Sequence, residues 1–232
     1  MAIILSIETA TTMCSVALHK GPDLLAIREL DEDKSHSRVL AGMIQDVIVE
    51  GGLEMSELDA VAISQGPGSY TGLRIGTATA KGLCFSLDIP LIAVSTLKSM
   101  AHGMKFLLQA DKMEAWLCPM IDARRMEVYC WLADANLNEI EAEQAKVIVK
   151  ESFDVELEHH QIVFFGNGAA KCEPLLGQSN NALFNAALIP SASFVGNLAQ
   201  IQYAKKKFQD LAYFEPEYLK EFQTTKPKAR ID

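Results

Sequence analysis

Hydrophobic residues along this chain fall into short runs, separated by turns rich in glycine, proline and charged residues. Residues 3–7 form an apolar run interrupted only by Ser6, which is typical of a central strand buried on both faces of a sheet. Positions 14, 16 and 18 are apolar in alternation, and residues 24–30 form a further strand-like run after a Lys-Gly-Pro-Asp turn. The pattern predicts that the chain opens with a three-stranded meander.

The next segment has the periodicity of a helix. Ser35 is suited to cap its N-terminus, and Gly51 and Gly52 are suited to end it. Between them apolar residues recur at spacings of three and four, which predicts a helix with a wide stripe facing a core. The stripe consists of Val39, Leu40, Met43, Ile44, Val47 and Ile48.

A strand, a turn and a second helix follow. Residues 60–63 read as a buried strand, and Gly66-Pro67-Gly68 continues neither strand nor helix. From position 71 the pattern is helical, with Gly72, Gly76 and Ala80 on one face. A glycine inside a helix costs about 1 kcal/mol relative to alanine, so the stripe predicts that another backbone comes close there. The stretch is neither a Rossmann fingerprint nor a P-loop, because Thr71 stands where the fingerprint needs glycine and no Gly-Lys-Ser/Thr follows.

The run Gly-Pro-Gly-Ser-Tyr-Thr-Gly-Leu-Arg-Ile-Gly at residues 66–76 resembles the signature of the bacterial TsaB family, formerly YeaZ. Two further matches extend the resemblance: Asp-Ala-Arg followed by Glu-Val-Tyr within residues 122–129, and Pro-x-Tyr-Leu-Lys at residues 216–220. Lys220 stands where the family usually has arginine, so a bidentate contact would be weakened. The resemblance implies an α/β fold of the actin-like/Hsp70-like ATPase type (ASKHA, ribonuclease H-like). It also implies a partnership with TsaD in making threonylcarbamoyladenosine in tRNA.

The second half of the chain resembles a degraded copy of the first. An apolar run ends in Asp122, residues 126–132 alternate as its hairpin partner, and residues 161–165 lead into Gly166-Asn167-Gly168. A predicted helix over residues 192–206 completes the series. The shared order fits two duplicated β-β-β-α-β-α lobes, as expected of an actin-like fold. We place them at residues 1–109 and 110–223, and we expect residues 224–232 to be a flexible tail.

Composition narrows the class of protein. No apolar run approaches the roughly 20 residues that span a bilayer, so we expect no membrane association. Five scattered cysteines without a C-x-x-C indicate reduced thiols and a cytoplasmic location. A net charge of −9 opposes a tight grip on a phosphate backbone. We therefore expect tRNA to be bound through a complex and not by this chain alone.

The resemblance also implies a weak nucleotide site. In actin-like folds the turn after the first strand presents an acidic residue and small hydroxyls to nucleotide phosphates, and the positions here are Glu8 and Thr9, with Gly66 and Gly68 nearby. The alternative interpretation is that Glu8 merely caps a solvated turn. We expect no tightly bound cofactor, and ATP or ADP with Mg²⁺ only at the level of a complex.

No metal site is expected. In TsaD the start of the third helix carries two histidines four residues apart, and the matching positions here are Thr96 and Met100, which cannot replace an imidazole pair. His102 has Lys98 and Phe106 at that spacing, so it forms no pair either.

Three functions compete. The first is a non-catalytic scaffold and activator that pairs with TsaD, helped by TsaE, in threonylcarbamoylation of adenosine 37 of tRNAs that read codons beginning with A. The alternative is an autonomous ATP-dependent transferase of actin-like fold, for which Glu8, Asp122 and two glycine turns are a sparse set of ligands. The third, a peptidase, lacks a linked nucleophile and base or a metal pair. We favour the first.

The predicted partner surface combines the first two helices. We expect a four-helix contact with TsaD, or with a second copy of this chain when TsaD is missing. The alternative is that the glycines pack only against the chain's own sheet. The predicted contact residues are Val39, Met43, Val47, Gly72, Leu73, Gly76, Ala80, Leu83 and Leu87.

Overall fold

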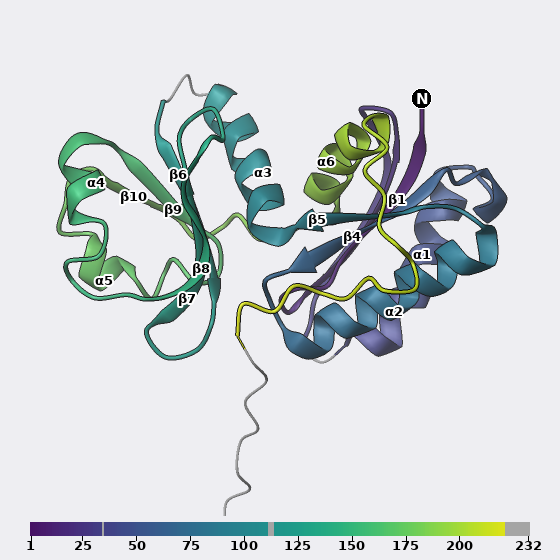
Figure 1. Ribbon diagram of the computed structural model, residues 1–232, viewed down its shortest axis with the longest axis horizontal. Helices are drawn as coiled ribbons and strands as arrows, with labels where there is room; N and C mark the ends of the chain where they lie inside the picture. The colour runs from purple at the N-terminus through teal and green to yellow at the C-terminus, as the bar shows by residue number, and fades with distance from the viewer. Residues whose placement is uncertain (34, 111–113, 221–232) are drawn as a thin grey trace, which may run out of the picture.

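The computed structural model describes residues 1–33, 35–110 and 114–220. Two five-stranded sheets form two lobes side by side, with helices packed against both sheets (Figure 1). This is the α/β architecture expected from the sequence. The tail expected at residues 224–232 lies outside the described residues.

The first sheet has the strand order β3-β2-β1-β4-β5. Its first three strands form the predicted antiparallel meander, and β4 and β5 then join parallel to β1 and to each other. The strands are β1 (Ile3–Glu8), β2 (Met13–Lys20), β3 (Asp23–Asp31), β4 (Ala60–Gly66) and β5 (Leu91–Ser95). The helices that follow β3 and β4 are α1 (His36–Glu50) and α2 (Tyr70–Leu87), and a short 3₁₀ turn, η1 (Met55–Glu57), precedes β4.

The second sheet repeats this topology with the order β10-β9-β6-β7-β8. An antiparallel meander of β6, β7 and β8 is again joined by two parallel strands, so the predicted duplication is seen strand by strand. The strands are β6 (Trp116–Asp122), β7 (Glu127–Ala133), β8 (Glu139–Val147), β9 (Ile162–Phe165) and β10 (Ala182–Asn185). The helices between them are short: α4 (Asp154–His159) and α5 (Glu173–Leu176).

Each face of the first sheet has its own core because successive strand residues point to opposite sides. Leu5 and Val61 pack with α1 and α2, whereas Ile4, Ala60 and Ala62 face α6 (Ala192–Ala204). The alanines leave room for α6 to lie close to the sheet.

The two lobes exchange their last helices. Helix α3 (Thr96–Ala110) follows the first sheet in sequence, but Met100 and Met104 pack in the core of the second sheet. Helix α6 follows the second sheet and packs against the first, through Val195 and Ala199. Each sheet is therefore covered by a helix from the other half of the sequence. Among the described residues, no helix has the length and apolar character to cross a bilayer.

Candidate functional site

Glu8 ends β1 and is fully buried. One carboxylate oxygen, Oε1, accepts hydrogen bonds from the Ala10 amide at 2.6 Å and from Ser64 Oγ at 2.9 Å. The other, Oε2, has no hydrogen-bond partner among the described residues. Burial raises the pKa of Glu8 to about 7, although the bonds from Ala10, Ser64 and Thr9 oppose the rise. The carboxyl group is therefore partly protonated at neutral pH, and it caps a buried turn instead of the solvated one considered from the sequence.

The turn after β1 lies against the glycine face of α2. The carbonyl oxygen of Thr9 occupies the place where a side chain on Gly72 would begin, and Thr9 Oγ1 does the same at Gly76. Close approach of another backbone, predicted from the stripe, thus occurs within the chain. The space beside these two glycines is filled by Thr9 of the same chain.

Gly66 and Gly68 are the other two residues predicted to bind a nucleotide. Both lie against the backbone of another part of the chain. Gly66 has a φ of +116°, and a Cβ atom there would lie 2.5 Å from the carbonyl oxygen of Glu217. A Cβ atom on Gly68 would overlap the Ala10 carbonyl group.

A phosphate cradle at these residues would lie at the start of α2, where two backbone amides are already bonded within the chain. Such a cradle needs free backbone amides at a helix N-terminus. The Ser69 amide instead donates to the Ala10 carbonyl at 2.6 Å, and the Gly72 amide donates to Ser69 Oγ at 3.3 Å. Two surface hollows, of about 180 and 210 Å³, lie on the second lobe and include none of these four residues.

The two positions matched in the sequence to the metal-binding histidines of TsaD lie in the protein interior. Thr96 and Met100 are both fully buried, and Met100 belongs to the core beneath the second sheet. Burial lowers the pKa of His102, with a smaller contribution from Lys105. Within residues 1–33, 35–110 and 114–220, no group of three His, Cys, Asp or Glu side chains is arranged to hold a metal ion.

The turn between β6 and β7 is exposed. Arg124 and Arg125 have left-handed φ angles of 71° and 51°, which non-glycine residues seldom adopt outside tight turns. Lys171 forms an ion pair with Asp122 in the same turn. The pair of arginines thus lies on a solvated hairpin turn.

Most of the nine residues predicted to contact a partner are buried within the chain. Val39, Leu83 and Leu87 are half-buried against the first core, and the other six are buried. The apolar and glycine stripes of α1 and α2 are the faces that cover the sheet and the turn after β1.

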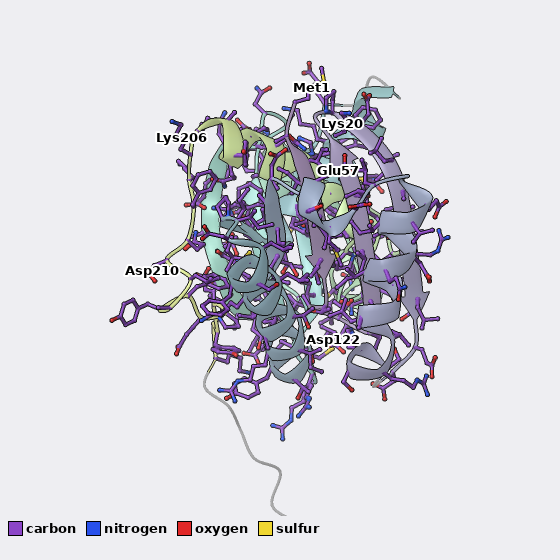
Figure 2. The ribbon with its side chains drawn as sticks, turned by 90° about the vertical axis from the view of Figure 1, so that its right-hand side faces the viewer. Met1, Lys20, Glu57, Asp122, Lys206 and Asp210 are labelled. Carbon is purple, nitrogen blue, oxygen red and sulfur yellow. The ribbon has the colours of Figure 1, made fainter. Side chains whose placement is uncertain are left out.

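The outward faces of α1 and α2 carry small residues flanked by two large apolar ones. Both helices lie on the side of the first lobe that is turned to the viewer in Figure 2. Phe85 is 82% exposed and Val49 is 70% exposed. The small exposed residues are Ala41 and Gly42 on α1 and Ala78 and Gly82 on α2.

This outer face was missed in the sequence because two small-residue stripes run along α2. Gly72, Gly76 and Ala80 form one, while Ala78 and Gly82 form the other, and only packing against the turn after β1 tells them apart. An added Cβ at Gly82 meets no atom within 4 Å. On α2, the glycine that leaves room for contact with another molecule is therefore Gly82.

Comparison with known proteins agrees with the fold and with the motifs. Residues 30–229 match the family described as TsaD, tRNA N6-adenosine threonylcarbamoyltransferase. The tRNA threonylcarbamoyladenosine biosynthesis protein TsaB of Haemophilus influenzae is 31% identical, over 96% of this chain and 95% of the relative. The solved structure of YeaZ from Pseudomonas aeruginosa superposes with a TM-score of 0.79 at 26% identity, covering 94% of this chain and 100% of that chain.

A more distant structure shows the fold alone. The activator of 2-hydroxyisocaproyl-CoA dehydratase from Clostridium difficile, with bound ADPNP, has a TM-score of 0.53 at 10% identity and covers 90% of this chain and 98% of its own. The actin-like ATPase fold implied by the resemblance is thereby confirmed. Together with the signature at residues 66–76 and the repeated five-stranded topology, these matches show that the chain belongs to the TsaB (YeaZ) family.

Proposed function

We propose that this protein is a non-catalytic subunit of the assembly that makes threonylcarbamoyladenosine at position 37 of tRNAs. It acts by binding TsaD, with TsaE as a further partner. The observation that carries the proposal is the match to a TsaB protein over 96% of the chain. An exposed two-helix face on the first lobe supplies a surface of the kind that a related subunit would cover.

The surroundings of Glu8 and Thr96 support a role without chemistry of its own. Glu8 is sequestered under the turn after β1, and Thr96 and Met100 lie where the TsaD relative is expected to carry its metal pair. We propose that any ATP or Mg²⁺ requirement belongs to the assembly. Likewise, a net charge of −9 supports assigning most tRNA contact to the other subunits.

The proposed partner face is the outer surface of α1 and α2. Large exposed apolar side chains beside small ones are typical of helix contacts in which an anchor inserts and the backbones come close. Phe85 and Val49 supply the anchors, and Gly42 and Gly82 leave open space beside them. The same face on a second copy of the chain would give a two-fold homodimer that competes with the complex.

The test compares variants on and off this face. Gly82→Leu fills open space, so we expect it to fold normally, and leucine also favours a helix more than glycine does. We expect Gly82→Leu and Phe85→Ala each to weaken binding to TsaD at least about tenfold, the equivalent of 1.4 kcal/mol. Binding is measured by titration, and the modified adenosine is quantified in tRNA from cells carrying each variant.

Phe106→Ala is the matched control, because Phe106 is also exposed near the end of a helix but lies on α3. It should bind TsaD as the unaltered protein does. Normal binding and normal modification by the Gly82 and Phe85 variants would contradict the proposed face. ATP turnover by the pure chain, abolished by Glu8→Ala, would instead support the autonomous transferase.

A further inference from the structure

After α6 the chain returns along the first lobe as an extended segment, residues 209–220, which we name the C-terminal strap. It begins at the free edge of the first sheet, where the Gln209 amide donates to the Leu91 carbonyl at 2.9 Å. In Figure 1 it is the yellow segment that runs beside α2 toward the second lobe. The strap thus covers a sheet edge and then leads away from it.

Helix α2 holds the middle of the strap. Lys81 Nζ donates to the carbonyl oxygens of Ala212 at 3.2 Å and Phe214 at 3.1 Å. The side chain of Phe214 packs against the first core from the same segment. This part of the strap therefore moves with the first lobe.

Further along, the strap pairs with the end of β4. The Glu217 amide donates to the Gln65 carbonyl at 2.7 Å, and Gln65 Nε2 donates to Glu217 Oε2 at 2.9 Å. The left-handed glycine at position 66 is what lets the Glu217 carbonyl come so close. A larger residue at Gly66 would push the strap away from this turn.

The next residue, Tyr218, joins a small aromatic and cationic stack. Its ring lies 4.8 Å from that of Tyr70, centroid to centroid, and Arg74 lies 4.1 Å from the centre of the Tyr70 ring. Arg74 Nε also donates to Tyr218 Oη at 3.3 Å. Both partners of Tyr218 belong to the first turns of α2.

Two residues later the strap reaches the other lobe. Lys220 Nζ forms an ion pair with Glu127, the first residue of β7. The family's usual arginine is replaced here by lysine, and the contact is nevertheless made, as a pair of point charges. The strap therefore connects α2 and β4 of the first lobe to the second sheet.

The junction between the lobes has a different structure at its other end. There α3 and α6 lie side by side, and Gly103 of α3 adjoins the ring of Phe194 of α6. These two helices are also the segments through which each half covers the other half's sheet. A rotation of the lobes about α3 and α6 would separate Lys220 from Glu127.

We propose that the C-terminal strap is a latch that fixes the separation of the two lobes, with α3 and α6 as the hinge at the opposite end. The first-lobe side of the latch is Glu217 and Tyr218, and the second-lobe side is the Lys220–Glu127 ion pair. In this position the strap also covers Gly66, through the carbonyl oxygen of Glu217. The inference is independent of the identity of the partner.

The test measures the distance between the lobes in the full-length chain. Spin labels are placed on cysteines introduced at exposed Gln45 of α1 and exposed Glu158 of α4, because the five native cysteines are buried. We expect one narrow distance distribution for the unaltered protein. Lys220→Glu and Tyr218→Ala should each broaden it and move it to a different mean, and the combined variant should do so most.

Three controls separate a latch from a general effect on stability. Lys207→Glu makes the same charge change, and Tyr213→Ala the same truncation, at exposed positions, and both should leave the distribution unchanged. The reciprocal exchange of Lys220→Glu with Glu127→Lys should restore the narrow distribution. An unaltered distribution in the combined Tyr218 and Lys220 variant would overturn the proposal, as would a failure of the charge exchange to restore it.

Discussion

The two lobes share one topology but treat the acidic residue at the end of their first strand in opposite ways. Glu8 in the first lobe is buried with one unpartnered oxygen, whereas Asp122 in the second lobe is exposed and paired with Lys171. The glycine turns are retained in both, since Gly66 and Gly166 each have a positive φ and each adjoin a backbone carbonyl. The duplication has therefore kept the glycine turns, while the carbonyl that each glycine meets (Glu217 of the strap or Met120 of β6) and the side-chain chemistry diverged.

The helices differ even more. In the first lobe α1 and α2 are 15 and 18 residues long, while α4 and α5 at the equivalent places have six and four residues. A two-helix outer face is thus a property of the first lobe only, within the described residues. The proposed partner face therefore lies on the first lobe, and the second lobe contacts that lobe through α3, α6 and the strap.

The largest expected effect comes from filling the inner glycine stripe. Gly76→Leu would place side-chain atoms on Thr9 and within 2.9 Å of Ile63, so it should lower the free energy of unfolding by more than about 3 kcal/mol, the upper end of usual overpacking costs. Chemical denaturation measures the change. Gly82→Leu, with the same substitution on the outer stripe, should lose no stability. Equal losses in the two variants would show that the inner and outer stripes are wrongly distinguished.

A somewhat smaller effect is expected from the buried carboxyl group. Because burial raises the pKa of Glu8 from 4.5 to about 7, the folded protein binds more protons than the unfolded chain between these values. The free energy of unfolding that depends on protonated Glu8 is fully present below pH 4.5, and it is lost as the pH rises to about 7. At 1.36 kcal/mol per pKa unit the loss is about 3 kcal/mol.

Denaturation of the unaltered protein and of Glu8→Gln across pH 5 to 8 tests this. Glu8→Gln should remove most of the decline in unfolding free energy with rising pH. Asp122→Asn, the equivalent change in the exposed turn of the second lobe, should leave the decline in place. A decline that persists in Glu8→Gln would mean that another group is responsible.

The sequence predicted the strands and helices of both lobes because their periodicities were strong. Residues 3–7 read as a buried strand and form β1, and the stripe from Val39 to Ile48 forms the inner face of α1. The glycine stripe predicted that another part of the structure comes close, and within the chain the residue that does so is Thr9. Deciding between Thr9 and a partner's helix requires the position of the turn after β1, which sequence periodicity does not contain.

The contacts that join distant parts of the chain could not be predicted from the sequence either. The exchange of α3 and α6 between lobes leaves no local signal, since an apolar helix stripe looks the same whichever sheet it covers. The Pro-x-Tyr-Leu-Lys motif was recognised, but its pairing with Gln65, Tyr70 and Glu127 joins residues more than 90 positions apart. Burial of Glu8 likewise depends on the packing of β4 and α2 around it.

The central claim is that the outer face of α1 and α2 is the surface by which this protein acts. Amide hydrogen exchange, recorded for the chain alone and with saturating TsaD, tests it most directly because bound helices open less often. The account predicts slower exchange in α1 and α2, around residues 41–49 and 78–85, with little change in α4 and α5. Slower exchange confined to the second lobe, with α1 and α2 unchanged, would contradict it.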